Sequence, residues 1–244
     1  MTTRLNVAAL VGVVVFSIGS PVWAGYKLMP KGMVQPIGKL GLSVTPPNDW
    51  NRLIAKIGRN AERWTLDGLS LNDLTFYSGI EDGRTLFREV DKKNRPLPRF
   101  KASMLPTDIV SLFETSYRVA AGTSLFEINK VEPTIFAGKA GVHFTYDFVE
   151  QDEEVRRDGE GTGAIIGGKL YLLTFEAPAI HYFARDIVWY RALVPSARVN
   201  KLFNVQSRSQ RQAQAYPRLP ASAAVRSEEW LAAGYRRAHN LARD

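Results

Sequence analysis

The chain has 244 residues, 45% of them hydrophobic, and a formal net charge of +8 at pH 7. It contains no cysteine, which excludes disulfide bonds, thiolate metal sites and a lipid-modified N-terminal cysteine. The charge does not indicate nucleic-acid binding, because residues 200–244 hold eight basic and three acidic side chains and residues 1–24 hold one basic side chain. Residues 25–199 are therefore nearly neutral.

Residues 1–24 have the three-part layout of a secretory signal. Arg4 precedes an uncharged apolar run at residues 7–18, and the segment ends in the small residue Ala24. This run is short for a membrane-spanning helix, which needs about 20 residues. We expect cleavage between Ala24 and Gly25 and a periplasmic or secreted protein, with an uncleaved membrane anchor as the alternative.

Residues 25–40 contain Pro and Gly at close spacing, which predicts an extended linker before a domain at residues 41–199. Alternating apolar residues predict the first strands of this domain at 42–44, 63–68 and 71–80. Residues 81–105 are rich in Arg, Lys and Pro and predict a long exposed connection.

The helical period is clearest at residues 106–122. Thr107 or Asp108 can cap this helix and Gly122 can end it. The apolar stripe expected to face the core consists of Ile109, Leu112, Phe113, Ser116 and Ala120. A second helix is predicted at 182–199, where Pro195 bends or ends it and the core-facing side chains are Ile187, Tyr190, Ala192 and Leu193.

Four strands are predicted between these helices, at residues 125–138, 141–151, 154–166 and 169–178. Pro133 places the first at an edge or a bulge, and Gly167 and Gly168 form a turn between the last two. Consecutive strands joined by hairpins form an antiparallel sheet, so the sequence predicts an α+β fold in which helices flank the sheet. Residues 200–244 are expected to be a flexible basic tail, with a candidate short helix from Ser227.

Three stretches, GLSVTPPNDW at 41–50, WTLDG-x-x-LNDLTFYSGI at 64–80 and LYLLTFEAP…YRALVPSARV at 170–199, carry a resemblance to known proteins. The chain resembles uncharacterised exported proteins of Gram-negative bacteria. It is similar to the PsbP-like fold, which is shared by the photosystem II extrinsic protein PsbP and a Ran-binding import factor. The resemblance implies an antiparallel sheet between helices and a role in binding or assembly, and it transfers no site residues.

Two motifs suggest chemistry that their surroundings do not support. The glycines of GEGTG at 159–163 are followed by a strand and a hairpin, whereas a dinucleotide loop requires a helix there. We expect these glycines to mark a bulge or positions where side chains must stay small. The neighbouring acids lack the spacing of a calcium loop and predict a solvated turn; they are Asp152, Glu153, Glu154, Asp158 and Glu160.

The candidate ligand-binding residues are His143, Asp147 and Glu176. His143 and Asp147 share one face of a strand, and Glu176 alternates with apolar neighbours. Neither a G-x-S-x-G elbow nor an H-E-x-x-H motif is present, so no catalytic or metal-binding residue and no cofactor is assigned. Aromatic side chains in the same strands are expected to pack in the core, and the alternative is that they line a ligand cleft.

These features predict an exported, non-enzymatic binding or assembly protein whose partner is an unknown protein or envelope component. Nucleic acid is not expected as a partner, and membrane attachment is expected only if residues 1–24 are kept. Two alternatives stay open, an exported hydrolase with a site around His143, Asp147 and Glu176, and a carrier of a small ligand.

Overall fold

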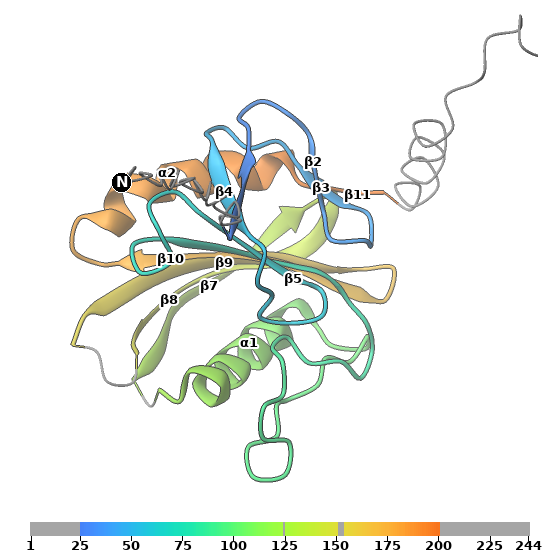
Figure 1. The fold of residues 1–244 in the computed structure, drawn as a ribbon. Coiled ribbons are helices and arrows are strands. Elements are labelled where there is room, and N and C mark those ends of the chain that lie inside the picture. The colour runs from blue at the N-terminus through green and yellow to red at the C-terminus, as the bar shows by residue number, and fades with distance from the viewer. Residues whose placement is uncertain (1–24, 124, 151–153, 201–244) are drawn as a thin grey trace, which may run out of the picture.

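The computed structural model describes residues 25–123, 125–150 and 154–200 (Figure 1). The predicted signal sequence and the predicted tail after Asn200 lie outside the described residues, so the cleavage point and the tail stay predictions. Within the described part of the chain, no helix is both long and apolar enough to cross a membrane.

A large antiparallel sheet forms the centre of the described structure, with eight strands in the order β1-β4-β5-β6-β10-β9-β8-β7 (Figure 1). In this order the strands are β1 (Tyr26–Met29), β4 (Trp50–Leu53), β5 (Ala61–Thr65), β6 (Asp73–Ile80), β10 (Lys169–Pro178), β9 (Arg156–Ile166), β8 (Lys139–Val149) and β7 (Phe126–Phe136). A small three-stranded sheet pairs β11 (Arg198–Val199), β3 (Leu42–Val44) and β2 (Gln35–Ile37).

Two helices cover opposite faces of the large sheet, α1 (Pro106–Ala121) on one and α2 (Tyr182–Leu193) on the other (Figure 1). Each face has its own apolar core, because strands in the middle of the sheet bury the side chains of both faces. Phe113 of α1 packs on Phe144 and Tyr146 of β8, whereas Tyr190 of α2 packs on Phe175 of β10. The predicted α+β fold, an antiparallel sheet flanked by helices, is confirmed.

The first helix follows its predicted stripe, since Ile109, Leu112, Phe113 and Ser116 are buried, although Ala120 is exposed. Its N-terminal cap differs from the prediction. Leu105 is the cap residue, and the Asp108 carboxylate accepts a hydrogen bond of 2.8 Å from the Leu105 N–H. Gly122 ends the helix in the left-handed region at φ 69°, where glycine has no steric cost.

The predictions for the middle of the chain are also confirmed. β8 buries Val142, Phe144, Tyr146 and Phe148 on the face towards α1, and β9 and β10 form a hairpin closed by Gly167 and Gly168. Pro133 lies in β7, which is an edge strand of the large sheet and therefore tolerates a missing N–H.

The linker predicted at residues 25–40 is wrong, because these residues contain β1 and β2. Met29 and Ile37 are buried, and this burial orders a segment whose Pro and Gly content suggested a loose connection. Pro36 is accommodated because β2 lies at the edge of the small sheet. The connection at 81–105 is irregular as predicted, but it buries Leu86, Leu97 and Phe100 and so forms part of the core around α1.

The second helix is shorter than the predicted range of 182–199. It ends at Leu193, because Pro195 cannot continue it, and a 3₁₀ turn (Val194–Ser196) leads into β11. Ile187, Tyr190 and Leu193 are buried as expected, but Ala192 is exposed.

Candidate functional site

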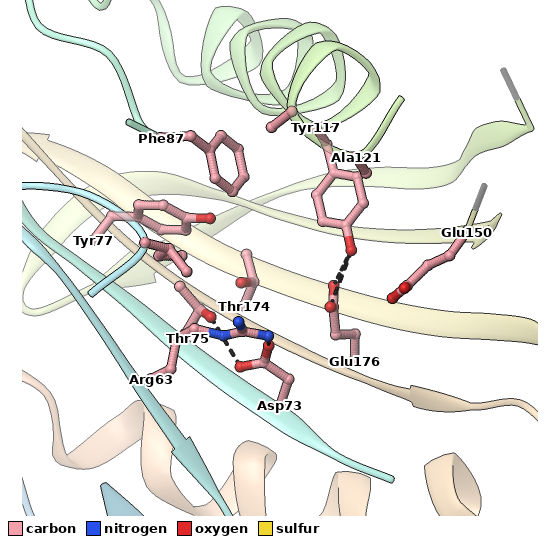
Figure 2. Close-up of a pocket in the computed structure, with 12 residues that line it drawn as sticks. Arg63, Asp73, Thr75, Tyr77, Phe87, Tyr117, Ala121, Glu150, Thr174 and Glu176 are labelled. Carbon is pink, nitrogen blue, oxygen red and sulfur yellow. Dashed lines mark hydrogen bonds and ion pairs between the residues drawn. The ribbon is translucent and has the colours of Figure 1, made fainter. Parts of the chain in front are cut away.

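A cavity of about 270 Å³ opens on the face of the large sheet that α1 covers (Figure 2). Strands β5, β6 and β10 form its floor, and the C-terminal end of α1 forms one wall. The described residues that line it are Ile57, Arg63, Asp73, Thr75, Tyr77, Phe87, Tyr117, Ala120, Ala121, Glu150, Thr174 and Glu176.

Two acidic residues face each other on the floor of the cavity. Asp73 of β6 and Glu176 of β10 are direct cross-strand partners, and both are buried. Like charges at such a position destabilise a sheet unless other groups compensate them. Arg63 of β5 forms an ion pair with Asp73, and the hydroxyl of Thr75 donates to the other oxygen of Asp73 at 3.0 Å (Figure 2). The charge of Asp73 is thereby compensated.

Glu176 is held by tyrosines. The Tyr117 hydroxyl lies 3.0 and 3.1 Å from its two oxygens, and the Tyr146 hydroxyl lies 3.3 Å from Oε2. Burial raises the pKa of Glu176 to about 7, and the charge of Asp73 adds to this effect, while Arg157, Arg63 and the hydrogen bond from Tyr117 oppose it. Glu176 therefore changes its charge close to neutral pH.

The GEGTG motif allows the tyrosine contact. A Cβ atom on Gly159 would lie 2.2 Å from Cζ of Tyr146, and one on Gly161 would lie 2.3 Å from Cζ of Phe144. Both rings of β8 thus lie across glycines of β9, and the pairing of the two strands runs without a bulge. Of the two expected roles of these glycines, the requirement for small side chains is the one that the structure confirms.

Three polar groups at the cavity lack a hydrogen-bond partner among the described residues. The side chains of Tyr77 and Thr174 are buried, and neither hydroxyl makes a hydrogen bond there. The Nε of Arg63 is a buried donor without an acceptor. The two hydroxyls are therefore available to water or to a ligand, whereas the Nε of Arg63 is enclosed by the protein.

Of the three residues predicted from the sequence, Glu176 alone lines this cavity. His143 and Asp147 point to the opposite face of the sheet, because alternate residues of β8 face opposite sides and Tyr146 faces α1. The Nε2 of His143 lies 2.9 Å from Glu160, and Asp147 lies 3.2 Å from Arg156. The structure does not bring the three candidates together.

The pKa of Glu160 is shifted in the opposite direction to that of Glu176. Burial alone would raise its pKa, but hydrogen bonds from His143 and Arg191 outweigh burial and lower it. Two glutamates on neighbouring strands and opposite faces of one sheet are therefore shifted in opposite directions. Glu160 is hydrogen-bonded to the guanidinium of Arg191, whereas the hydrogen bonds to Glu176 come from neutral tyrosine hydroxyls.

The sequence interpretation missed Arg63, Asp73, Tyr77 and Tyr117 as site residues. One signal was present, since the alternation of β6 places Asp73, Thr75 and Tyr77 on the same face and an acidic residue there interrupts an apolar strand. Nothing in the sequence indicated that α1 would bring Tyr117 to Glu176. The described residues contain no group of three or more His, Asp or Glu side chains that could hold a metal ion.

Comparison with known proteins gives similarities among solved structures only, since no family model and no curated protein matches the chain. The solution structure of cyanobacterial PsbP (CyanoP) from Synechocystis sp. PCC 6803 is similar with 17% identity and a TM-score of 0.45, covering 76% of this chain and 98% of that one. A Pseudomonas aeruginosa protein of unknown function, described as a putative regulator, has 12% identity and a TM-score of 0.34, covering 62% of this chain and 93% of its own.

A third similar structure is LpqN, described as involved in cell envelope biogenesis of Mycobacterium tuberculosis. It has 8% identity and a TM-score of 0.30, and the match covers 75% of this chain and 87% of LpqN. A PsbP protein is thus among the solved structures to which this chain is similar.

Proposed function

We propose that this chain is an exported, non-enzymatic binding protein and that its binding site is the cavity between α1 and the large sheet. The observation that carries the proposal is the pair of unpartnered hydroxyls at that cavity, those of Tyr77 and Thr174. A ligand that pairs with them gains hydrogen bonds that no described residue supplies.

The size of the cavity favours a small molecule as the ligand. Drug-sized ligands occupy pockets of about 300–1,000 Å³, and this cavity of about 270 Å³ lies just below that range. Aromatic rings of Tyr77, Phe87 and Tyr117 supply apolar surface, and the floor supplies polar groups. This combination of apolar walls and a few converging polar atoms is typical of small-molecule sites.

The arrangement supports binding over hydrolysis. The described residues that line the cavity include no serine, histidine or cysteine, and His143 and Asp147 face the other side of the sheet. Glu176 is tied by Tyr117 and Tyr146, which orients its carboxyl group towards the cavity without an adjacent nucleophile.

A variant that fills the cavity tests whether the cavity is the binding site. Ala121→Phe places a ring at the cavity wall, and Ser111→Phe adds the same ring to an exposed position of α1. Both variants and the unmodified chain are screened by ligand-observed NMR with neutral, anionic and cationic fragments. We expect fragments to bind the unmodified chain and Ser111→Phe but not Ala121→Phe. Binding that Ala121→Phe does not weaken, or no binding of any fragment, would overturn the proposal.

Export is proposed from residues 1–24 and has its own test. The chain is expressed from its first residue in a Gram-negative host, the cells are fractionated, and the protein is sequenced from its N-terminus. We expect a periplasmic protein that begins at Gly25. An intact Met1 in the membrane fraction would instead identify an anchor, and an intact chain in the cytoplasm would contradict export.

A further inference from the structure

We propose that the cavity binds a small organic cation, an ammonium compound that also carries an acceptor oxygen. This inference rests on the proposed binding function and names the class of ligand. Three independent features of the cavity support it, namely an uncompensated carboxyl group, a set of aromatic rings and the positions of unpartnered hydroxyls.

The charges around the cavity pair off and leave one acidic group over. Arg63 is paired with Asp73. Arg157 lies 3.7 Å from Glu150 and donates to the backbone carbonyls of Leu69 and Ser70, which lie between β5 and β6. Glu176 forms no ion pair among the described residues and is held by neutral hydroxyls. A buried carboxylate without a cation is unfavourable, so the ligand that best completes this site brings a positive charge.

Aromatic rings surround the same space. Tyr77 and Phe87 have ring centroids 5.8 Å apart at 79°, and Phe87 and Tyr117 have centroids 6.0 Å apart at 86° (Figure 2). Rings at near right angles present both faces and edges to a common volume. An ammonium group over such faces gains cation–π stabilisation, which is the recognition mode of aromatic cages for amines.

The hydrogen-bonding groups match an ammonium ion as well. Its N–H donors require acceptors, and the carboxylate of Glu176 and the free hydroxyls of Tyr77 and Thr174 can all accept. A hydroxyl also donates, so an oxygen on the same ligand can accept a hydrogen bond from Tyr77 or Thr174. An anionic ligand is disfavoured because Asp73 and Glu176 form the floor.

Binding of a cation is coupled to the proton on Glu176. Its pKa is about 7, so about a tenth of the carboxyl groups are ionised at pH 6 and about nine tenths at pH 8. The charged groups around it are Asp73, Arg63, Arg157 and Glu150, and the titratable hydroxyls that face it are those of Tyr77, Tyr117 and Tyr146. The affinity for an amine that stays protonated should therefore rise about tenfold between pH 6 and pH 8.

The test uses isothermal titration calorimetry with ethanolamine, ethylamine, ethylene glycol and acetate at pH 6 and pH 8. We expect ethanolamine to bind more tightly than ethylamine, with a tenfold rise in affinity from pH 6 to pH 8. Binding should release nearly one proton at pH 6 and almost none at pH 8, where Glu176 is already mostly ionised. The proton release is measured by repeating the titration in buffers of different ionisation enthalpy. Ethylene glycol and acetate should not bind measurably, because neither carries a positive charge.

Two variants test whether ethanolamine binding and its pH dependence arise from Glu176. Glu176→Gln should weaken ethanolamine binding at least tenfold at pH 8 and abolish its pH dependence, with circular dichroism confirming the fold. His143→Ala, on the opposite face of the sheet, should leave the affinity unchanged. Unaltered ethanolamine binding to Glu176→Gln overturns the inference. If neutral or anionic fragments bind the cavity and amines do not, the inference fails while the proposed binding function stands, and if nothing binds, both fail.

Discussion

The hydroxyl of Tyr146 lies 3.3 Å from Oε2 of Glu176, although their strands, β8 and β10, are separated by β9. Neighbouring strands are about 4.8 Å apart, so a side chain that reaches two strands away must lie flat on the one between. Gly159 is the residue of β9 in register with both, and its missing side chain leaves the space that the Tyr146 ring occupies. A glycine in the middle of a strand is thus part of the candidate site.

Gly159→Ala should destabilise the chain by about 1–3 kcal/mol, because its Cβ would lie 2.2 Å from the Tyr146 ring and overpack the core. Gly25→Ala is the control, since a Cβ there meets nothing within 4 Å. The measurement is urea unfolding at pH 7. Combining Gly159→Ala with Tyr146→Ala should cost less than the sum of the single changes, and strict additivity would contradict the proposed contact.

The raised pKa of Glu176 predicts a pH-dependent stability of defined sign. The folded chain holds the proton up to about pH 7, whereas an unfolded glutamate loses it near its ordinary pKa of 4.5. This contribution is therefore fully present below about pH 4.5 and is lost as the pH rises to 7, by on the order of 3 kcal/mol. Glu176→Gln should remove this loss and be more stable than the unmodified chain at pH 8.

The check is urea unfolding of both chains at pH 5, 6, 7 and 8, with the difference between them plotted against pH. Other groups titrate equally in the two chains, so the difference isolates Glu176. A flat difference would mean that this carboxyl group is ionised throughout the range.

Tyr117→Phe should raise the pKa of Glu176 further, because the Tyr117 hydroxyl donates to both oxygens and favours the ionised form. The loss in stability should be about 1–2 kcal/mol at pH 8 and smaller at pH 5. Tyr171→Phe is a matched control, since its hydroxyl donates at 2.8 Å to the neutral carbonyl of Leu40. Carboxyl ¹³C NMR titration measures the pKa directly, and an equal response to both substitutions would contradict this role of Tyr117.

Asn72→Ala should destabilise the chain by about 2–3 kcal/mol. The buried Asn72 accepts from the Thr65 hydroxyl and the Leu66 N–H at 2.7 Å each and donates to Asp186 of α2 at 3.0 Å, so its removal leaves several buried groups unpaired. Asn129→Ala is the comparison, because Asn129 makes an exposed hydrogen bond to Asp147 and should cost less than about 0.5 kcal/mol. Thermal unfolding of both variants checks the prediction, and equal losses would contradict it.

Most of the fold could be predicted from periodicity, because each signal is local. The apolar alternation of β8 and the helical stripe of α1 each reside within about 16 residues, and the two-glycine turn identifies its hairpin from two positions. The wrong secondary-structure prediction, the linker at residues 25–40, concerns a segment that is ordered by contacts with residues distant in the sequence. β1 and β2 are short, and they are strands because they pair with β4 and β3, which no local pattern in residues 25–40 indicates.

For the candidate site too, some features follow from the local sequence pattern and others only from the tertiary structure. The sequence by itself determined that Glu176 alternates with apolar residues and that the glycines of β9 are not a nucleotide loop, since both follow from a strand and its neighbours. Only the tertiary structure decided that Glu176 faces Asp73, Tyr117 and Tyr146 while His143 faces the other side of the sheet. Strand order and helix placement set these encounters, and they depend on packing between residues up to about 100 positions apart along the chain, such as Asp73 and Glu176.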